Sequence, residues 1–250
     1  VEEEVGGNGT LSMVRRGEKA DAAVVLEPTE LKILSSVRGA VWFRIRCEGK
    51  AGHSGQPGRS VSALNVARRI MTALEQYHSD LLKKSRGIPL FDCFENPMPL
   101  TFGRLHAGDW PAAAPNEAIL EGVLGFLPNR TRSEVMVEFQ AAIDSALDAQ
   151  LRNSVQVEFT YRHDAHVLDT GHPLVQKLVS ASKNEGIQTE ISAMPASCDS
   201  WFYNNQLNIP AVVFGPGSLG VAHSAEEKIA LEDIATAARI LLRFILDGGA

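Results

Sequence analysis

The amino-acid sequence predicts an α/β protein in which a second, α+β domain is inserted into the first. Two observations support this prediction. Short apolar segments with abrupt ends occur near both ends of the 250-residue chain, and such segments are typical of strands buried in a parallel sheet. The middle of the chain instead alternates apolar and polar residues, as half-exposed strands do. We therefore expect one domain from residues 1–36 and 164–250 and an inserted domain from residues 37–163.

The outer domain should contain two apolar strands and a C-terminal helix. One strand is expected at residues 22–26, because this apolar run ends at Glu27-Pro28. The other is expected at 211–214, just before the glycine-rich segment 215–220. A closing helix is predicted over 231–246, where apolar residues recur at helical spacing. These residues are Ile234, Ala238, Leu241, Leu242 and Ile245.

The inserted domain is predicted to have the element order β-α-β-β-α-β. The elements are a strand at 41–47, a helix at 62–84, strands at 100–105 and 118–126, a helix at 133–151 and a strand at 155–161. The apolar face of the first helix is expected to consist of Leu64, Ala67, Ile70, Met71 and Leu74. This element order is that of a split-βαβ layer, with one face of the sheet open to solvent.

The composition excludes several classes of function. Hydrophobic residues make up 44% of the chain and charged residues 22%, as in folded rather than disordered proteins. The 30 acidic and 24 basic residues give a net charge of −6, which argues against a nucleic-acid partner. No apolar run approaches the roughly 18 residues of a membrane span, so no membrane partner is expected. The 3 cysteines, which are far apart, do not predict a disulfide framework, and this favours a cytoplasmic protein.

The chain begins abruptly at Val1 with a run of three glutamates. The sequence does not begin with Met, and its first residues do not have the pattern expected of a signal peptide. Because residues suited to site chemistry stand at its very start, we expect the chain to be the C-terminal portion of a longer protein, either a fragment or a cleaved product.

Four features of the sequence could carry chemistry, and each has an ordinary structural alternative. The segment 3–10 places neighbouring glutamates on a glycine-rich turn, where they repel unless a cation or proton lies between them, but it could also be a solvated acidic end. Glu27 ends an apolar strand, a position where α/β proteins collect ligands, but it could also be a helix N-cap or a turn acid. His223 follows the strand at 211–214 and could bind a metal or be merely solvated. His53 could donate a hydrogen bond to an oxyanion or serve as a turn residue.

These features occur together in an order that resembles a known family. The matching segments are EEVGGNGT (3–10), DAAVVLEPT (21–29), GKAGHSGQPGRSVSALNVA (49–67), PNEAILEGVLGFLP (115–128) and IPAVVFGPG…AHSAEE (209–227). The chain resembles the zinc-dependent amidohydrolases and exopeptidases that include acetylornithine deacetylase, succinyl-diaminopimelate desuccinylase and aminoacylase. It looks most like the acetylornithine-deacetylase-like branch, which also contains formylaminopyrimidine deformylases.

The resemblance implies a metal-dependent hydrolase that cleaves an amide bond in a small N-acylated amino acid or a related, dipeptide-like amine. Family members use two Zn²⁺ ions, for which Co or Mn could substitute. By resemblance, Glu3 is the general base, Glu4 and His223 bind one zinc ion, and Glu27 binds the other.

The same resemblance assigns the inserted, ferredoxin-like layer to a lid and dimerisation domain. His53 matches a lid histidine that reaches the active site of the partner subunit, which makes a homodimer the expected assembly. Asn116 matches a lid residue that approaches the substrate.

The sequence departs from the family pattern at two places. The family's other first-metal His and its bridging Asp lie upstream of the double glutamate, where this chain has no residues. We therefore expect zinc to be held poorly and the chain alone to be inactive. Many relatives carry an Arg for the substrate carboxylate where this chain has Gly125, so acetylornithine itself is not the expected substrate, and Arg130 or Arg132 would be no more than a speculative substitute.

Two other functions compete with hydrolysis. The segment 215–220 fits G-x-G-x-x-G, but a dinucleotide site needs a helix that opens directly on the glycines, whereas periodicity places the helix only at 231. The chain could instead be a non-catalytic dimerisation module that carries an incomplete catalytic remnant.

Overall fold

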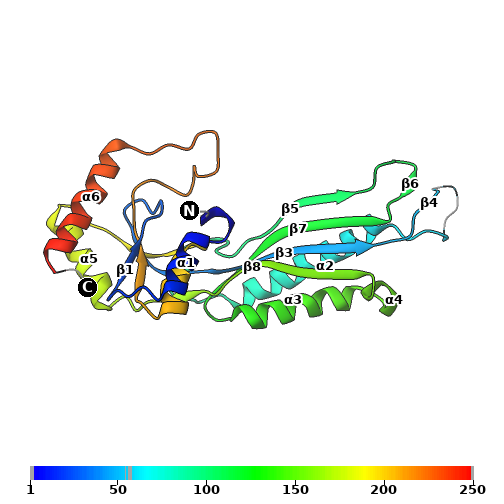
Figure 1. Cartoon of the computed structure of the whole chain (residues 1–250), viewed down its shortest axis with the longest axis horizontal. Coiled ribbons are helices and arrows are strands. Elements are labelled where there is room, and N and C mark those ends of the chain that lie inside the picture. The colour runs from blue at the N-terminus through cyan, green and yellow to red at the C-terminus, as the bar shows by residue number, and fades with distance from the viewer. Residues whose placement is uncertain (1–2, 54, 56–57, 249–250) are drawn as a thin grey trace. The chain divides into compact units, whose positions relative to one another are not determined.

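The computed structural model describes residues 3–53, 55 and 58–248, which form two compact units (Figure 1). Unit 1 comprises Val1–Arg38, Ile88–Glu95 and Asp164–Ala250, and unit 2 comprises Gly39–Gly87 and Asn96–His163. Within the described part of the chain, no helix is both long and apolar enough to cross a membrane. The three cysteines are all free thiols.

Unit 1 is built on a mixed sheet in the order β1-β11-β2-β10, with β9 paired to β2. The strands are β1 (Ala23–Val25), β2 (Ile33–Val37), β9 (His166–Val167), β10 (Ile191–Met194) and β11 (Ala211–Val213). The pairs β1/β11 and β2/β10 are parallel, whereas β11/β2 and β2/β9 are antiparallel. The prediction of a parallel sheet is therefore only partly right.

The strand predicted at 22–26 is shorter and more exposed than expected. It spans Ala23–Val25, its residues are half-buried, and the side chain of Leu26 is 63% exposed. The reason is its position at the edge of the sheet, where β11 covers only one of its sides. By contrast, β11 has neighbours on both sides and is fully buried.

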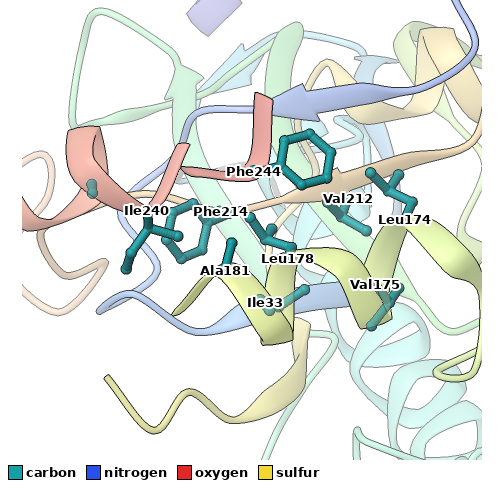
Figure 2. Close-up of a cluster of buried hydrophobic side chains, with 10 residues drawn as sticks. Ile33, Leu174, Val175, Leu178, Ala181, Val212, Phe214, Ile240 and Phe244 are labelled. Atoms are coloured by element: carbon teal, nitrogen blue, oxygen red, sulfur yellow. The ribbon is translucent and has the colours of Figure 1, made fainter. Parts of the chain in front are cut away.

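The main core of unit 1 lies between the sheet and two helices, α5 (Pro173–Asn184) and α6 (Leu231–Leu246) (Figure 2). Phe214, directly after β11, packs there with Leu178 of α5 and Ile240 of α6. The bounds predicted for α6 are correct, and of the apolar residues at helical spacing Leu241 packs against this core, but most of the others do not. Its buried residues are Thr236, Ala237, Ile240 and Phe244, whereas Ile234, Leu242 and Ile245 are exposed. Because α6 is apolar over much of its circumference, periodicity alone does not identify the buried face.

Unit 2 has the predicted order of strands and helices. Its antiparallel sheet has the order β5-β7-β3-β8, and α2 and α3 lie together on one of its faces (Figure 1). The elements are β3 (Gly39–Glu48), α2 (Ala63–Lys84), β5 (Leu100–Ala107), β7 (Glu117–Phe126), α3 (Arg132–Ala146) and β8 (Val155–His163). Alternate residues of β3 are buried against the helices, as the sequence pattern predicts.

Three details of unit 2 differ from the prediction. The helix expected at 133–151 breaks into α3 and α4 (Ala149–Arg152), because the carboxylate of Asp148 caps a new helix by accepting from the Leu151 N–H at 3.0 Å. The buried face of α2 includes Val66, whereas Leu64 is 41% exposed. A short ribbon of β4 (Gly52–His53) and β6 (Ala113–Ala114) was not expected.

A buried histidine, His166, takes part in a chain of polar contacts inside unit 1. His166 Nε2 lies 2.9 Å from Ser200 Oγ, which in turn lies 3.1 Å from Cys198 Sγ. Burial lowers the pKa of His166 from 6.5 to about 4, so the imidazole is neutral in the folded protein at pH 7.

We expect this histidine to make folding less favourable in acid. A group whose pKa is lower in the folded than in the unfolded state stabilises the fold above the unfolded pKa, and that contribution is lost as the pH falls from 6.5 towards 4. His166→Gln removes the titration, so its destabilisation relative to wild type should shrink by about 2 kcal/mol between pH 7.5 and pH 5. Urea unfolding at the two pH values measures the difference. A destabilisation that does not change with pH would contradict this account of His166.

Candidate active site

The acidic turn at the start of the chain has a backbone that only glycine accommodates easily. Glu3–Val5 form a short 3-10 helix, η1, and Asn8–Arg16 form helix α1. Gly6 and Gly7 join them with φ angles of 118° and 67°, in the left-handed region. The turn leaves Glu3 half-buried and Glu4 exposed.

Glu27 is held at the end of β1 by close contact with the chain that follows β11. A Cβ atom on Gly215 would lie 2.5 Å from the carbonyl oxygen of Glu27, so only glycine fits there. The hydroxyl of Thr29 is 3.0 Å from both the carbonyl oxygen and the amide nitrogen of Gly215 and ties the two segments together. The first glycine of the G-x-G-x-x-G segment therefore has a packing role. No helix opens on that segment, since α6 begins only at Leu231.

His223 contacts the acidic turn from the other end of the chain. Its Nε2 atom lies 3.2 Å from Glu4 Oε1, although the two residues are 219 positions apart. The backbone N–H of His223 donates to the Glu227 carboxylate at 3.2 Å, and the residue itself has a φ of 58°. The side chains of His223 and Glu4 are 75% and 71% exposed, so both can reach a ligand from solvent.

The glutamates of this region repel one another. Burial raises the pKa of Glu27 to about 7, and the negative charges of Glu3, Asp199 and Glu4 add to the rise. Burial also raises the pKa of Glu3, again with contributions from Asp199 and Glu4, while His223 opposes the shift. The four site residues predicted in unit 1 are thus linked electrostatically, and His223 also contacts Glu4 directly. Carboxylates in this arrangement favour a bound cation or a shared proton.

Asp199 is a member of this cluster that the sequence analysis missed. Its Oδ2 atom accepts a hydrogen bond from the Thr10 hydroxyl at 2.5 Å. Its Oδ1 atom is buried and has no hydrogen-bond partner among the described residues. No local pattern around residue 199 singles it out, because its partners lie almost 190 residues away.

The donor atoms at this site suit a divalent metal, but their number is small. Carboxylate oxygens of Glu4 and Glu27 and the imidazole nitrogen of His223 are ligands that Zn²⁺ accepts. Within residues 3–53, 55 and 58–248, however, no group of three or more His, Cys, Asp or Glu side chains is arranged to hold a metal ion. The structure therefore brings Glu4 and His223 together without completing a coordination shell.

The remaining predicted site residues belong to unit 2. His53 lies on β4, is exposed, and accepts a hydrogen bond from the Gly55 N–H at its Nδ1 atom, at 3.0 Å. Asn116 precedes β7 and is exposed, and its carbonyl accepts from the Gly49 N–H at 2.7 Å. Ser54, Gln56 and Pro57 of the same motif lie outside the described residues, as do Val1 and Glu2. The roles of His53 and Asn116 stay predictions.

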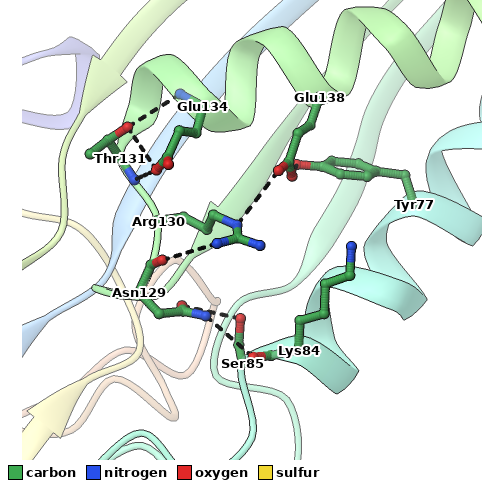
Figure 3. Close-up of polar contacts among 8 residues, drawn as sticks. All are labelled: Tyr77, Lys84, Ser85, Asn129, Arg130, Thr131, Glu134 and Glu138. Atoms are coloured by element: carbon green, nitrogen blue, oxygen red, sulfur yellow. Dashed lines mark hydrogen bonds and ion pairs between the residues drawn. The ribbon is translucent and has the colours of Figure 1, made fainter.

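Arg130 is engaged in a contact between α2 and α3 (Figure 3). Its Nε atom lies 3.6 Å from Glu138 of α3, whose carboxylate also accepts from the Tyr77 hydroxyl of α2 at 3.0 Å. Arg132, at the start of α3, donates a hydrogen bond to the carbonyl oxygen of Arg162 on β8 at 3.3 Å. Both arginines thus have structural partners within unit 2, which weakens the suggestion that either replaces a substrate-binding Arg at Gly125.

Comparison with known proteins supports a common ancestry along most of the chain. The family model described as peptidase family M20/M25/M40 matches residues 1–247. A deformylase of N-formyl-4-amino-5-aminomethyl-2-methylpyrimidine from Bacillus subtilis is 26% identical, over 98% of this chain and 62% of its own length. An acetylornithine deacetylase from Vibrio cholerae is 27% identical, over 90% of this chain and 57% of its own. The chain thus spans about 60% of the length of these curated relatives.

Solved structures share the fold at lower sequence identity. A tripeptidase from Staphylococcus aureus superposes with a TM-score of 0.75 at 17% identity, over 98% of this chain and 61% of its own. An M20 metallo-carboxypeptidase from Sulfolobus solfataricus gives 0.75 at 16%, over 98% of this chain and 68% of its own. The predicted α/β class and the predicted family are therefore confirmed. The chain belongs to the peptidase family M20/M25/M40.

Proposed function

We propose that this protein is a metal-dependent hydrolase of amide bonds in small N-acylated amines. The observation that carries the proposal is the contact between Glu4 and His223. Glu3 and Glu27 are close enough to interact electrostatically with this pair or with each other. These residues come from three separate segments of unit 1 and are the ones that the family resemblance assigns to the reaction.

Glu4 and His223 would hold one zinc ion, and Glu27 would take part in holding a second. When bound, such ions supply Lewis-acid chemistry, which polarises a carbonyl and lowers the pKa of water. Co or Mn could serve in place of zinc because the donors are oxygen and imidazole nitrogen.

Glu3 would act as the general base. It removes a proton from water as the water oxygen bonds to the amide carbon, and it returns that proton to the amine nitrogen as the C–N bond breaks. The products are a carboxylic acid and an amine. Burial and neighbouring carboxylates raise the pKa of Glu3, which makes this carboxylate a stronger base than an exposed glutamate.

The substrate class is proposed from the names of the relatives. One removes a formyl group and the other an acetyl group from an amine nitrogen, so a small acyl group is the shared feature. We propose that this chain takes a small N-acyl amino acid or a related amine. Gly125 lies within β7 and is buried, so it offers no cation to a substrate carboxylate.

We further propose that unit 2 serves as a lid and dimerisation domain. His53, exposed on the β4–β6 ribbon, would stabilise the oxyanion in the active site of a partner subunit, and Asn116 would approach the substrate. A homodimer is therefore the proposed assembly.

One observation favours a second candidate, a non-catalytic dimerisation module. The described residues contain no group of three side chains arranged to hold a metal. Such a module would not need to bind zinc, so metal binding separates the two functions.

The general base can be tested with Glu3→Gln in the product of the whole gene. The amide keeps the size of the side chain but cannot accept the proton, so kcat should fall by ~10²–10⁴-fold while the zinc content stays unchanged. Hydrolysis of N-acetyl and N-formyl amino acids, together with metal analysis, measures both. Glu226→Gln, in the exposed loop of His223, is the matched control and should keep both activity and zinc. Loss of zinc with activity spared would show that the roles of Glu3 and Glu4 are reversed.

Metal content tests the site itself. We expect two zinc ions per chain in the product of the whole gene and fewer in the 250-residue polypeptide after dialysis, because its described residues do not form a three-ligand group. His223→Ala and Glu4→Gln should each lower the zinc content of the longer form. Plasma mass spectrometry of all four samples gives the answer. Zinc absent from both wild-type forms would rule out the hydrolase and leave the dimerisation module.

A further inference from the structure

We infer that Asp199 is a positioning residue that fixes the Glu3–Gly7 turn against unit 1, and thereby places Glu3 and Glu4 for the reaction. The inference rests on the proposed function for its catalytic consequence. Its structural part stands on the contacts of Asp199 alone.

The first contact is a hydrogen bond to the helix that follows the turn. The Thr10 hydroxyl, in the first turn of α1, donates to Asp199 Oδ2 at 2.5 Å. A short bond to a carboxylate is stronger than one between neutral groups, so it holds the start of α1 firmly.

The second contact is the close approach of Gly7. A Cβ atom at Gly7 would lie 2.2 Å from Asp199 Oδ1 and 2.6 Å from a ring carbon of Phe202. The bare Cα of Gly7 therefore rests directly on the carboxylate and on the aromatic ring beside it. Together the two contacts hold both ends of the stretch from Gly7 to Thr10, where the turn joins α1.

Asp199 is itself held by a rigid segment. Its carbonyl accepts from the Phe202 N–H at 3.0 Å, at the start of the π-helix η2 (Phe202–Leu207), against which α1 packs. On either side of it, Cys198 and Ser200 are buried and contact each other, and Ser200 is bonded to His166. A π-helix is rare and is frequently found at functional sites.

The position of the Asp199 carboxylate also costs folding free energy. A contact that served stability alone would not leave a carboxylate oxygen buried without a partner. Its Oδ1 atom is buried and has no hydrogen-bond partner among the described residues, and an unsatisfied buried acceptor is destabilising. A residue in this position supports the glutamates without being one of the groups that touch the substrate.

The test uses variants that separate position from charge in the product of the whole gene. Asp199→Ala and Thr10→Val remove the hydrogen bond, Thr10→Ser keeps the donor, and Asp199→Asn keeps an acceptor of the same shape without the charge. Amide hydrogen exchange over residues 3–12 is measured in metal-free protein. Zinc affinity by chelator competition, kcat and KM are measured on the same variants.

We expect Asp199→Ala and Thr10→Val to speed exchange over residues 3–12, weaken zinc binding by about 10–100-fold and lower kcat by a similar factor with little change in KM. Thr10→Ser and Asp199→Asn should restore exchange protection and most of the zinc affinity. Unchanged exchange and affinity in Asp199→Ala and Thr10→Val would overturn the inference. It would also be overturned if Asp199→Asn were as impaired as Asp199→Ala while Thr10→Val behaved as wild type, since the charge alone would then matter.

The exchange measurement keeps the two proposals separate. If the wild-type protein neither binds zinc nor hydrolyses amides, the proposed function fails. The exchange of residues 3–12 in the variants still decides whether Asp199 fixes the turn.

Discussion

Repulsion among the carboxylates around the acidic turn is the constraint on which the surrounding structure depends. Like charges held this close need a cation, a proton or firm support from the chain. Part of that support comes from two glycines that lie so close to neighbouring atoms that a side chain would not fit. Gly7 lets the turn rest on Asp199, and Gly215 lets Glu27 lie against the segment that follows β11. The close approach at these two glycines therefore helps to keep the glutamates in place.

Much of the fold could be predicted from local patterns. The alternation in β3 identified its buried face, and the bounds of α6 were correct because helix periodicity extends over its full length. The failures arose where tertiary contacts decide. The sequence of β1 resembles a central strand, yet it lies at an edge, and the apolar surface of α6 is too broad to indicate which face packs inward. The break before α4 depends on one capping carboxylate, Asp148, within an otherwise helical pattern.

The candidate site was less accessible to local reasoning. Glu27 and His223 were each ambiguous from spacing alone, and the family resemblance, not the periodicity, selected them. Asp199 was missed because its importance comes from Thr10 and Gly7, which are distant in sequence. Arg130 was suggested for substrate binding from its type and position, but its partner Glu138 on α3 engages it in a contact between helices. A charged residue acquires its role from its neighbours in space, which one sequence does not reveal.

The contact between His223 and Glu4 also bears on how the protein is made. The two residues stand at nearly opposite ends of the chain, and β1 pairs with β11, which is synthesised almost two hundred residues later. During translation, the acidic turn and β1 therefore leave the ribosome well before the segments that contact them, His223 and β11. Contacts of such long range also slow folding, since the ends of the chain must meet before the site gains stability.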